Sequence, residues 1–450
     1  MNRKRIVVTI AMVCTMTAVL TFGGRFVGRV SAVAKDTYEN LEVFTNVLAL
    51  VQKNYVDPVS TKQLIEGAIT GMLAALDPHS AYLPPDLYKE LQVDTRGSFG
   101  GLGIEITTKN NVLTVVSPIE DTPAYRAGIK SGDQIIKIQD EFTKDMPLVE
   151  AVKKMRGPKG TKIHLSLRRE GVPNLIEYTL TREVIKIQSV KSRMLEKNYG
   201  YVRVTQFQER TDDDLERALS DLDHQNGGPV SGLILDLRNN PGGLLTQAVK
   251  VADEFVDSGM VVYTDGRLES QKQKYFAHKA GSHTDFPMIV LVNGGSASAS
   301  EIVAGCLQDH KRALVLGTQT FGKGSVQTIL PLDESAAIRL TTARYYTPNG
   351  RSIQATGITP DVIVDITPIT QAKAEGGPGF PAIREQNLPR HFEGKGKSAP
   401  GNETKSIQEE PEEAPAAKEG ELGKDPQLDR ALELLKSWNV FKAVVAQNTP

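Results

Sequence analysis

A serine that follows a glycine-rich turn is the first candidate for chemistry in this sequence. Ser298 lies after the apolar run Met288 to Val292 and before a pattern typical of a helix, Ala299 to Gln308. Such a strand-to-helix turn exposes a nucleophile and directs backbone N–H groups towards an oxyanion. Ser298 and Glu301 also have the S-x-x-E spacing of a helix capping box, which is a purely structural interpretation. The two interpretations are compatible, so a catalytic partner has to decide between them.

A nucleophilic serine needs a base, and none of the seven histidines is an obvious one. His310 ends the helix that Ser298 would begin, and about ten residues of helix keep them roughly 15 Å apart. Lys323 remains, in the turn Gly322-Lys323-Gly324, but its amine accepts a proton at neutral pH only if burial lowers its pKa. Gln327 offers a neutral amide that orients the amine without restoring its charge. A lysine in a glycine turn is also typical of a solvated surface.

The same glycine turn permits a weaker alternative, nucleotide binding. Gly317, Gly322 and Lys323 have the spacing of a phosphate-binding loop, and Asp236 ends an apolar strand as the metal-holding acid of such enzymes does. However, Gly324 stands where a magnesium-binding Ser or Thr is needed, and the next segment is strand-like rather than helical. We therefore expect no cofactor. We expect no metal site either, since the chain has only two cysteines.

The elements that position these residues predict several domains. Two amphipathic helices span 38–76, short strands with one helix pattern (148–155) fill 97–183, and strands alternate with helices from residue 200. This alternation indicates an α/β layer with much parallel pairing. Residues 371–424 are rich in Pro, Gly, Glu and Lys and predict a flexible linker, and an amphipathic helix pattern follows.

The N-terminus has the features of an export signal. Arg3-Lys4-Arg5 precede an apolar run from Ile6 to Phe22, and no acidic residue occurs before Asp36. The run only just reaches the length that spans a bilayer. Ala32-Val33-Ala34 resembles a cleavage site but lies far beyond the run, which favours an uncleaved anchor. Charge bias then places the rest of the chain outside the cytoplasm, in a periplasmic or other extracytoplasmic space.

Two segments together carry a family resemblance. Residues 295–301, Gly-Ser-Ala-Ser-Ala-Ser-Glu, and 320–327, Thr-Phe-Gly-Lys-Gly-Ser-Val-Gln, resemble the carboxyl-terminal processing peptidases, or tail-specific proteases, which are Ser–Lys endopeptidases. Residues 236–243, 343–350 and 357–361 also match. The resemblance implies that Ser298 is the nucleophile, Lys323 the general base and Gln327 its supporting amide. It implies oxyanion donors at the N–H groups of Ala299 and Gly243.

The β-rich segment resembles a PDZ domain, the usual companion in this family. Gly101-Leu102-Gly103-Ile104 matches the loop whose N–H groups bind a chain-terminal carboxylate, and residues 131–135 match a later turn and strand. The resemblance implies that Leu102, Gly103 and Ile104 bind a peptide carboxylate while the peptide adds as a strand. Arg156 would couple peptide binding to the active site. The simpler interpretations are an ordinary glycine turn and a solvated arginine.

These observations predict a multidomain α/β protein that is an exported serine endopeptidase. It would recognise protein substrates with apolar C-terminal tails through its PDZ domain, and the alternative is a PDZ-based adaptor with an inactive protease core. The 53 basic and 54 acidic residues nearly cancel, so we expect no nucleic-acid partner, and we expect a homo-oligomer formed through the N-terminal helices. The expected domains are a signal peptide or membrane anchor (1–34), a helical region (35–96), a PDZ-like domain (97–183), a Ser–Lys protease core (184–368), a flexible linker (369–424) and a C-terminal amphipathic helix (425–450).

Overall fold

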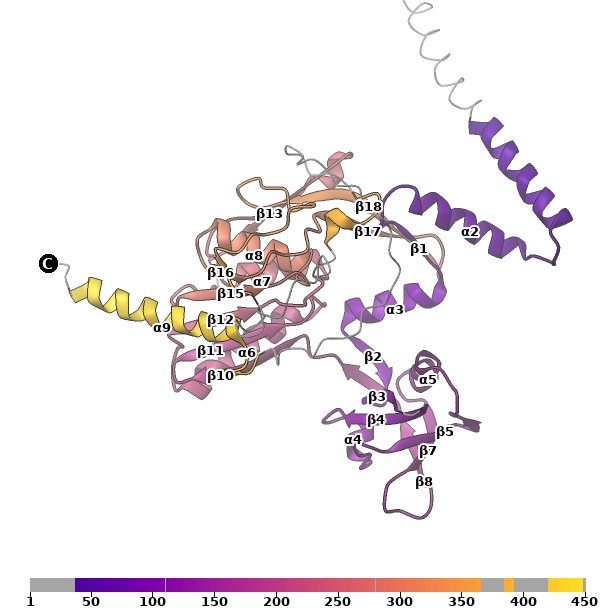
Figure 1. The fold of residues 1–450 in the computed structure, drawn as a ribbon, viewed down its shortest axis with the longest axis horizontal. Coiled ribbons are helices and arrows are strands. Elements are labelled where there is room, and N and C mark those ends of the chain that lie inside the picture. The colour runs from indigo at the N-terminus through magenta and orange to yellow at the C-terminus, as the bar shows by residue number, and fades with distance from the viewer. Residues whose placement is uncertain (1–36, 110, 280, 366–383, 392–419, 448–450) are drawn as a thin grey trace, which may run out of the picture. The chain divides into compact units, whose positions relative to one another are not determined.

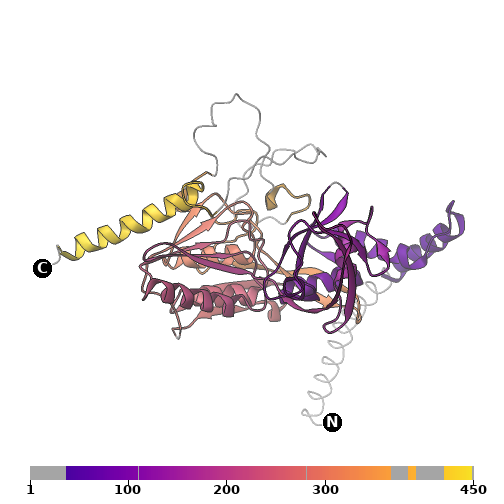
Figure 2. The same ribbon diagram turned by 90° about the horizontal axis from the view of Figure 1, so that it is seen from below.

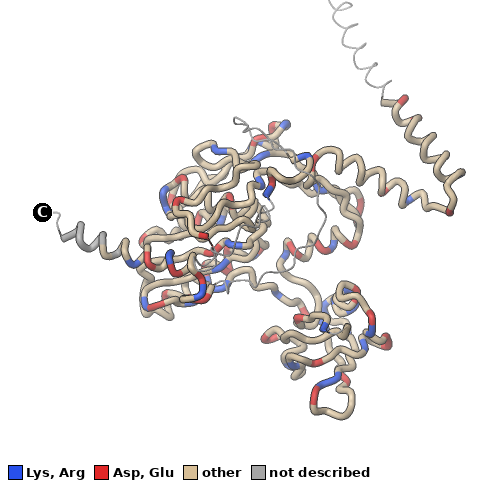
Figure 3. The backbone as a smooth tube through the Cα atoms, in the orientation of Figure 1, with Lys and Arg blue, Asp and Glu red and all other residues tan. Residues whose placement is uncertain are grey.

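The computed structural model describes residues 37–109, 111–279, 281–365, 384–391 and 420–447, and the chain divides into two compact units, Met1–Ala75 and Leu76–Pro450. The leader predicted over residues 1–34 lies outside the described residues. Within the described ranges, no helix combines the length and the apolar character needed to cross a membrane. Figure 3 shows basic and acidic residues interspersed along the backbone, in keeping with a net charge of -1.

The first unit is helical, as its apolar spacing predicts. Residues 37–54 form one helix and α2 (Thr61–Ala74) forms the next (Figure 1). The break between them contains Pro58, whose ring disfavours a helical conformation at the preceding residue. Many large apolar side chains of this unit are exposed to solvent: Leu41, Val43, Phe44, Val47, Leu50, Tyr55, Val56 and Met72.

The second unit begins with β1 (Ala81–Leu83) and α3 (Pro85–Arg96) and continues into the β-rich domain. Its main sheet is antiparallel, in the order β3-β4-β5-β7-β8 with β6 paired to β5, so β3 is an edge strand. A separate antiparallel pair, β2 with β9, brings the two ends of the domain together. The elements are β2 (Ser98–Gly101), β3 (Ile104–Lys109), β4 (Val112–Pro118), α4 (Pro123–Arg126), β5 (Gln134–Ile138), β6 (Glu141–Phe142), α5 (Leu148–Met155), β7 (Lys162–Arg168), β8 (Ile176–Thr181) and β9 (Glu183–Lys186).

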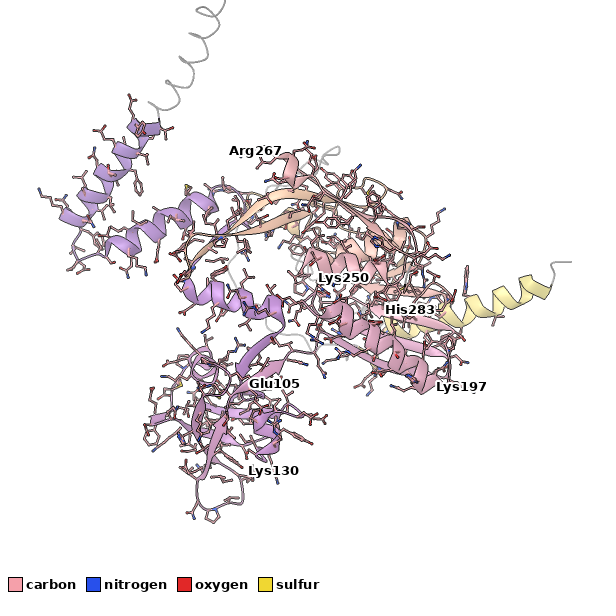
Figure 4. The ribbon with its side chains drawn as sticks, turned by 180° about the vertical axis from the view of Figure 1, so that it is seen from behind. Glu105, Lys130, Lys197, Lys250, Arg267 and His283 are labelled. Carbon is pink, nitrogen blue, oxygen red and sulfur yellow. The ribbon has the colours of Figure 1, made fainter. Side chains whose placement is uncertain are left out.

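The α/β domain is built on a six-stranded sheet in the order β10-β11-β12-β15-β16-β19, parallel except for β10. Every residue of β12 and β15 is buried, as expected for parallel strands covered on both faces. Lys250 of α7, labelled in Figure 4, pairs with Asp212 of the neighbouring α6. The elements are β10 (Val190–Glu196), β11 (Tyr199–Val204), α6 (Thr211–Asn226), β12 (Gly232–Asp236), α7 (Leu245–Asp253), β15 (Met288–Val292), α8 (Ala299–Asp309), β16 (Leu314–Gly317) and β19 (Val362–Ile363).

A second, antiparallel sheet belongs to the same unit. Its order is β1-β18-β13-β14, with β17 also paired to β18. The long strand β18 therefore joins β1, from the start of the unit, to strands more than 170 residues later in the chain. The elements are β13 (Gly259–Gly266), the short 3-10 helix η1 (Glu269–Gln271), β14 (Lys274–Ala277), β17 (Ser325–Pro331) and β18 (Ala337–Tyr346).

The first turns of the C-terminal helix, α9 (Pro426–Gln447), lie against one face of the parallel sheet, and the rest of the helix extends away from it (Figures 1 and 2). Leu428, Leu432 and Leu435 are buried in one cluster with Ile234, Ile289 and Leu291 of the strands. A charge network fixes the beginning of this helix. The guanidinium of Arg238, which is 1% exposed, donates to Asp236 (2.6 Å), Asp425 (2.7 Å) and Gln427 (3.0 Å).

One part of the predicted linker differs from the prediction. Residues 384–391 form an ordered segment with a 3-10 helix, η3 (Glu385–Asn387), and the side chain of Glu385 is completely buried. Composition predicted flexibility because the stretch cannot bury much apolar surface. This segment is instead held by polar contacts, which hydrophobic periodicity does not detect.

Candidate active site

Ser298 lies in a turn whose backbone conformation is unusual. The residue has φ 55° and ψ −110°, outside the regions that residues with a side chain normally occupy, and it immediately precedes α8. The turn is held by Ser296, whose hydroxyl donates to the carbonyl oxygen of Leu237 (2.8 Å), and by Asn293, whose side-chain oxygen accepts the N–H of Gly295 (3.0 Å). Strained non-glycine residues held in this way cluster at functional sites.

A second turn, at the end of β12, lies directly against Ser298. A Cβ atom on Gly242 would come within 2.9 Å of Ser298 Cβ and 3.0 Å of the Ala299 nitrogen, so only glycine fits there. Asn240 shapes the turn, since its side-chain oxygen accepts the Gly242 N–H (2.9 Å) and its carbonyl oxygen accepts the Ala297 N–H (3.0 Å). Within the described part of the chain, the N–H groups of Ala299 and Gly243 have no acceptor. Two unused donors thus flank the serine.

Lys323 is half-buried, in the turn before β17. Burial lowers the pKa of its amine, and the nearby charge of Arg339 lowers it further, while Glu385, Glu301 and Asp77 act in the opposite direction. The amine has no hydrogen-bond acceptor among the described residues, and no hydrogen bond joins it to the Ser298 hydroxyl. A lowered pKa increases the fraction of the lysine side chain that is a neutral amine and can accept a proton.

A single carboxylate, that of Glu301, connects the serine turn to the lysine turn. Its Oε2 accepts the N–H of Ser298 (2.8 Å) and the N–H of Lys323 (2.9 Å). Its Oε1 accepts the Thr320 hydroxyl (2.5 Å) and the Gly322 N–H (2.7 Å). The side chain is fully buried, and burial raises the pKa of Glu301 to about 7, although all of these hydrogen bonds oppose the rise. The S-x-x-E pattern predicted the bond to Ser298 but not the three to the lysine turn.

The backbone contacts of the lysine turn also bear on nucleotide binding. The N–H groups of Gly322 and Lys323 point at a carboxylate, and that of Gly324 donates to the side-chain oxygen of Gln354 (2.9 Å). Ser325 then begins a strand rather than a helix. A phosphate needs these N–H groups and a helix N-terminus, so the arrangement disfavours a phosphate-binding loop.

Gln327 lies on β17, two residues after Ser325, where the strand begins. Its amide nitrogen donates to Thr341 Oγ1 (2.8 Å) and more weakly to Ser325 Oγ (3.3 Å). Its side-chain oxygen is buried without any hydrogen-bond partner. Such unpartnered buried acceptors are rare in native proteins and are typical of sites that bind or orient another group.

Histidines do not contribute to the serine turn. His310 is the C-cap residue of α8, at the opposite end from Ser298, and its Nε2 lies 2.7 Å from the carbonyl oxygen of Met260. His79 is bonded to Glu385, at 2.7 Å. Neither Glu385 nor His79 was a predicted site residue.

The β-rich domain presents its glycine loop beside an edge strand. Gly103 has φ +74°, and its carbonyl oxygen accepts the Ile119 N–H (2.8 Å). The N–H groups of Leu102 and Gly103 have no acceptor within the described ranges, and Ile104 begins the edge strand β3. Arg156 follows α5 and places its guanidinium 4.4 Å from the centre of the Phe99 ring. The loop therefore offers free donors next to a strand that a peptide can extend.

Comparisons with known proteins assign the domains. Residues 198–364 match the family described as peptidase family S41, residues 90–168 match the PDZ domain, and residues 25–86 match the N-terminal domain of the activating protease CtpB. The α/β domain that carries Ser298 and Lys323 is thus the S41 domain.

Similar proteins cover most of the chain. It is 48% identical over 371 residues to the carboxy-terminal-processing protease of Bartonella bacilliformis, covering 82% of this chain and 84% of that protein. It is 35% identical over 366 residues to the carboxy-terminal processing protease CtpA of Bacillus subtilis, covering 80% and 76%. A solved structure, the photosystem II D1 C-terminal processing protease, is 33% identical with a TM-score of 0.41, covering 72% of this chain and 92% of that one. The chain belongs to the carboxy-terminal processing proteases of peptidase family S41, with a PDZ domain beside its protease domain.

Proposed function

We propose that Ser298 and Lys323 form the catalytic dyad of this protease. The neutral amine of Lys323 removes the proton of the Ser298 hydroxyl as the oxygen attacks a substrate carbonyl. The resulting ammonium then protonates the leaving amine, and an acyl-enzyme ester remains. Water, deprotonated by the same lysine, hydrolyses the ester and restores the serine.

The observation that carries this proposal is the carboxylate of Glu301 between the two turns. Because the same oxygen accepts the N–H groups of Ser298 and Lys323, the two backbones are fixed next to each other. The lowered pKa of Lys323 supports a neutral amine. The amine would meet the hydroxyl in the substrate complex, because hydrogen bonds at catalytic sites often tighten only when substrate binds.

The neighbouring groups have supporting roles in the proposed mechanism. The free N–H groups of Ala299 and Gly243 would stabilise the oxyanion of the tetrahedral intermediate, and loss of one such donor typically costs about 2.7–4 kcal/mol of barrier. The unpartnered oxygen of Gln327 would accept a hydrogen bond from the Lys323 amine and orient its lone pair.

We propose that the PDZ domain selects substrates by their C-terminal tails. The N–H groups of Leu102, Gly103 and Ile104 would bind the terminal carboxylate, and the peptide would pair with the free edge of β3. Arg156 would respond to bound peptide, because its guanidinium rests on Phe99 of β2, in the strand pair that closes the domain.

Location and assembly belong to the same proposal. We infer from the basic and apolar leader that the chain is exported, with residues 1–34 as a signal peptide or inner-membrane anchor. Exposed Leu41, Phe44 and Val47 on the first helix favour a homo-oligomer. Cell fractionation tests the first inference. Light scattering of wild type and Phe44→Glu tests the second, and equal masses that correspond to a monomer would refute it.

The decisive experiment compares cleavage of an unstructured peptide that ends in apolar residues. Ser298→Ala and Lys323→Ala should abolish cleavage, whereas Lys274→Ala, at an exposed lysine of β14, should retain it. A fluorophosphonate probe should label Ser298 in the wild type and not in Lys323→Ala, since labelling requires the base. Equal cleavage by all four proteins would contradict the dyad. Binding without cleavage by the wild type would favour the adaptor, which the family assignment makes the weaker alternative.

A further inference from the structure

A short segment from the predicted linker lies against the lysine turn. The backbone N–H of Glu385 donates to the carbonyl oxygen of Phe321 (3.2 Å), and Arg384 donates to the side-chain oxygen of Gln319 (3.3 Å). These contacts join residues separated by more than 60 positions in the sequence. Residues 384–391 are therefore docked on the loop that precedes Lys323.

The carboxylate of Glu385 makes the most specific contacts of this segment. Its side chain is 0% exposed, its Oε2 lies 2.7 Å from His79 Nε2, and its Oε1 accepts the amide N–H of Gln354 (2.8 Å). The side-chain oxygen of the same Gln354 accepts the N–H of Gly324 (2.9 Å). A continuous chain of hydrogen bonds thus connects Glu385 to the residue immediately after the lysine.

The charges around the Lys323 amine come from several elements. Glu385, Glu301 and Asp77 favour the ammonium form, whereas burial and Arg339 favour the neutral amine. Burial alone would raise the pKa of Glu385, but the bonds from His79 and Gln354 outweigh it and lower that pKa, so the group is ionised. Glu385 comes first among the carboxylates that act on the lysine.

We propose that Glu385 is a positioning residue for Lys323, which fixes the lysine turn through Gln354 and sets the balance between ammonium and neutral amine. The segment 384–391 is then a part of the active site rather than a spacer. This inference rests on the proposed role of Lys323 as the base. It adds a group that touches neither substrate nor the reacting atoms and acts only through the lysine and its turn.

Two variants separate the two parts of the role. Glu385→Gln keeps one acceptor oxygen for Gln354 but removes the charge, so the rising limb of the kcat/KM pH profile should move to lower pH with KM unchanged. Glu385→Ala also removes the acceptor, so kcat should fall by about tenfold, and amide exchange at Gly324 should become about tenfold faster. Glu334→Gln, at an exposed position, is the matched control and should behave as wild type.

A readout independent of proteolysis uses the Ser298→Ala background. The pH dependence of Lys323 acetylation by acetic anhydride, followed by mass spectrometry, reports the pKa of the amine directly. If Lys323 is acetylated at lower pH when Glu385→Gln is added to the Ser298→Ala protein, the proposal for Glu385 is supported. This holds even if the protein with Ser298 intact cleaves no peptide, because absence of cleavage would refute only the proposed function. The proposal for Glu385 would be overturned if the acetylation profiles with and without Glu385→Gln superimposed and amide exchange at Gly324 was unchanged in Glu385→Ala.

Discussion

The buried charge network at the beginning of α9 offers the sharpest test of how this fold is stabilised. Arg238 donates to Asp425 through both terminal nitrogens, at 3.0 and 2.7 Å, and Asp425 is 3% exposed. Asp425 also accepts the N–H of Leu428 (3.1 Å) and therefore caps the helix. Its replacement by Asn removes the charge and keeps a capping side chain, whereas replacement by Ala removes both.

The expected losses follow from these contacts. Breaking a buried ion pair typically costs about 3–5 kcal/mol when the partner charge is left alone. Because Arg238 keeps Asp236 (2.6 Å), Asp425→Asn should lower the free energy of unfolding by less than that, about 2 kcal/mol. Asp425→Ala should cost about 1 kcal/mol more, because the cap is lost as well. Both should also lower kcat, since Arg238 begins the turn that leads to Gly242.

The assay is urea denaturation combined with amide exchange in α9. Glu433→Ala, at an exposed position of the same helix, is the control and should change the stability by less than about 0.5 kcal/mol. The bond to Arg238 and the neighbouring N–H groups lower the pKa of Asp425 against the effect of burial. The ionised Asp425 therefore stabilises the folded protein fully above the ordinary aspartate pKa. This stabilisation is lost as the pH falls through the lowered pKa of Asp425 in the folded protein. Wild-type stability and exchange in Asp425→Asn would refute the reasoning.

The other predictions concern the proposed catalytic groups and the PDZ loop. With Lys323 as the base, kcat/KM should rise with pH through a midpoint below the ordinary lysine value, and a rise in Lys323→Ala with the same midpoint would contradict this. Gly242→Ala should reduce kcat by about 100-fold, because its Cβ would press on the serine turn. Gly227 has a similar positive φ but open space around it, so Gly227→Ala should lower stability without changing kcat. Equal kcat values for Gly242→Ala and Gly227→Ala would contradict a clash between the added Cβ and the serine turn. Gly103→Ala would place a Cβ 2.2 Å from the Cβ of Thr122 and should abolish binding of a labelled peptide in fluorescence polarisation. Undiminished affinity would exclude this loop as the site that binds the peptide carboxylate.

The sequence predicted the strand-to-helix unit around Ser298 well. An apolar strand, a run of small residues and the S-x-x-E pattern are local signals, and β15 and α8 begin and end close to the expected positions. Lys323 was predicted as the base from its glycine neighbours together with the family resemblance, and its role stays a prediction. These features need no knowledge of distant contacts.

Other parts could not be predicted because they depend on distant contacts. Glu301 binds a turn about 20 residues later, and Glu385 lies in a stretch without hydrophobic periodicity, so neither role leaves a local pattern. Helix α3 (Pro85–Arg96) lies within the helical region predicted over 35–96, but the apolar spacing itself indicated helices only as far as residue 76, and none of the residues of α3 is fully buried. The strand β13 (Gly259–Gly266) was not assigned, although its centre, Val261 and Val262, is buried.

The position of α9 has a consequence for the order in which the protein folds. During synthesis the strands β11, β12, β15 and β16 are complete at least 100 residues before Leu428 has been added. Until then one side of the sheet, with Ile234, Ile289 and Leu291, remains open to water and to other nascent chains. The domain therefore reaches its final stability only after its last helix has left the ribosome, which delays the appearance of a finished protease domain until nearly the whole chain has been made.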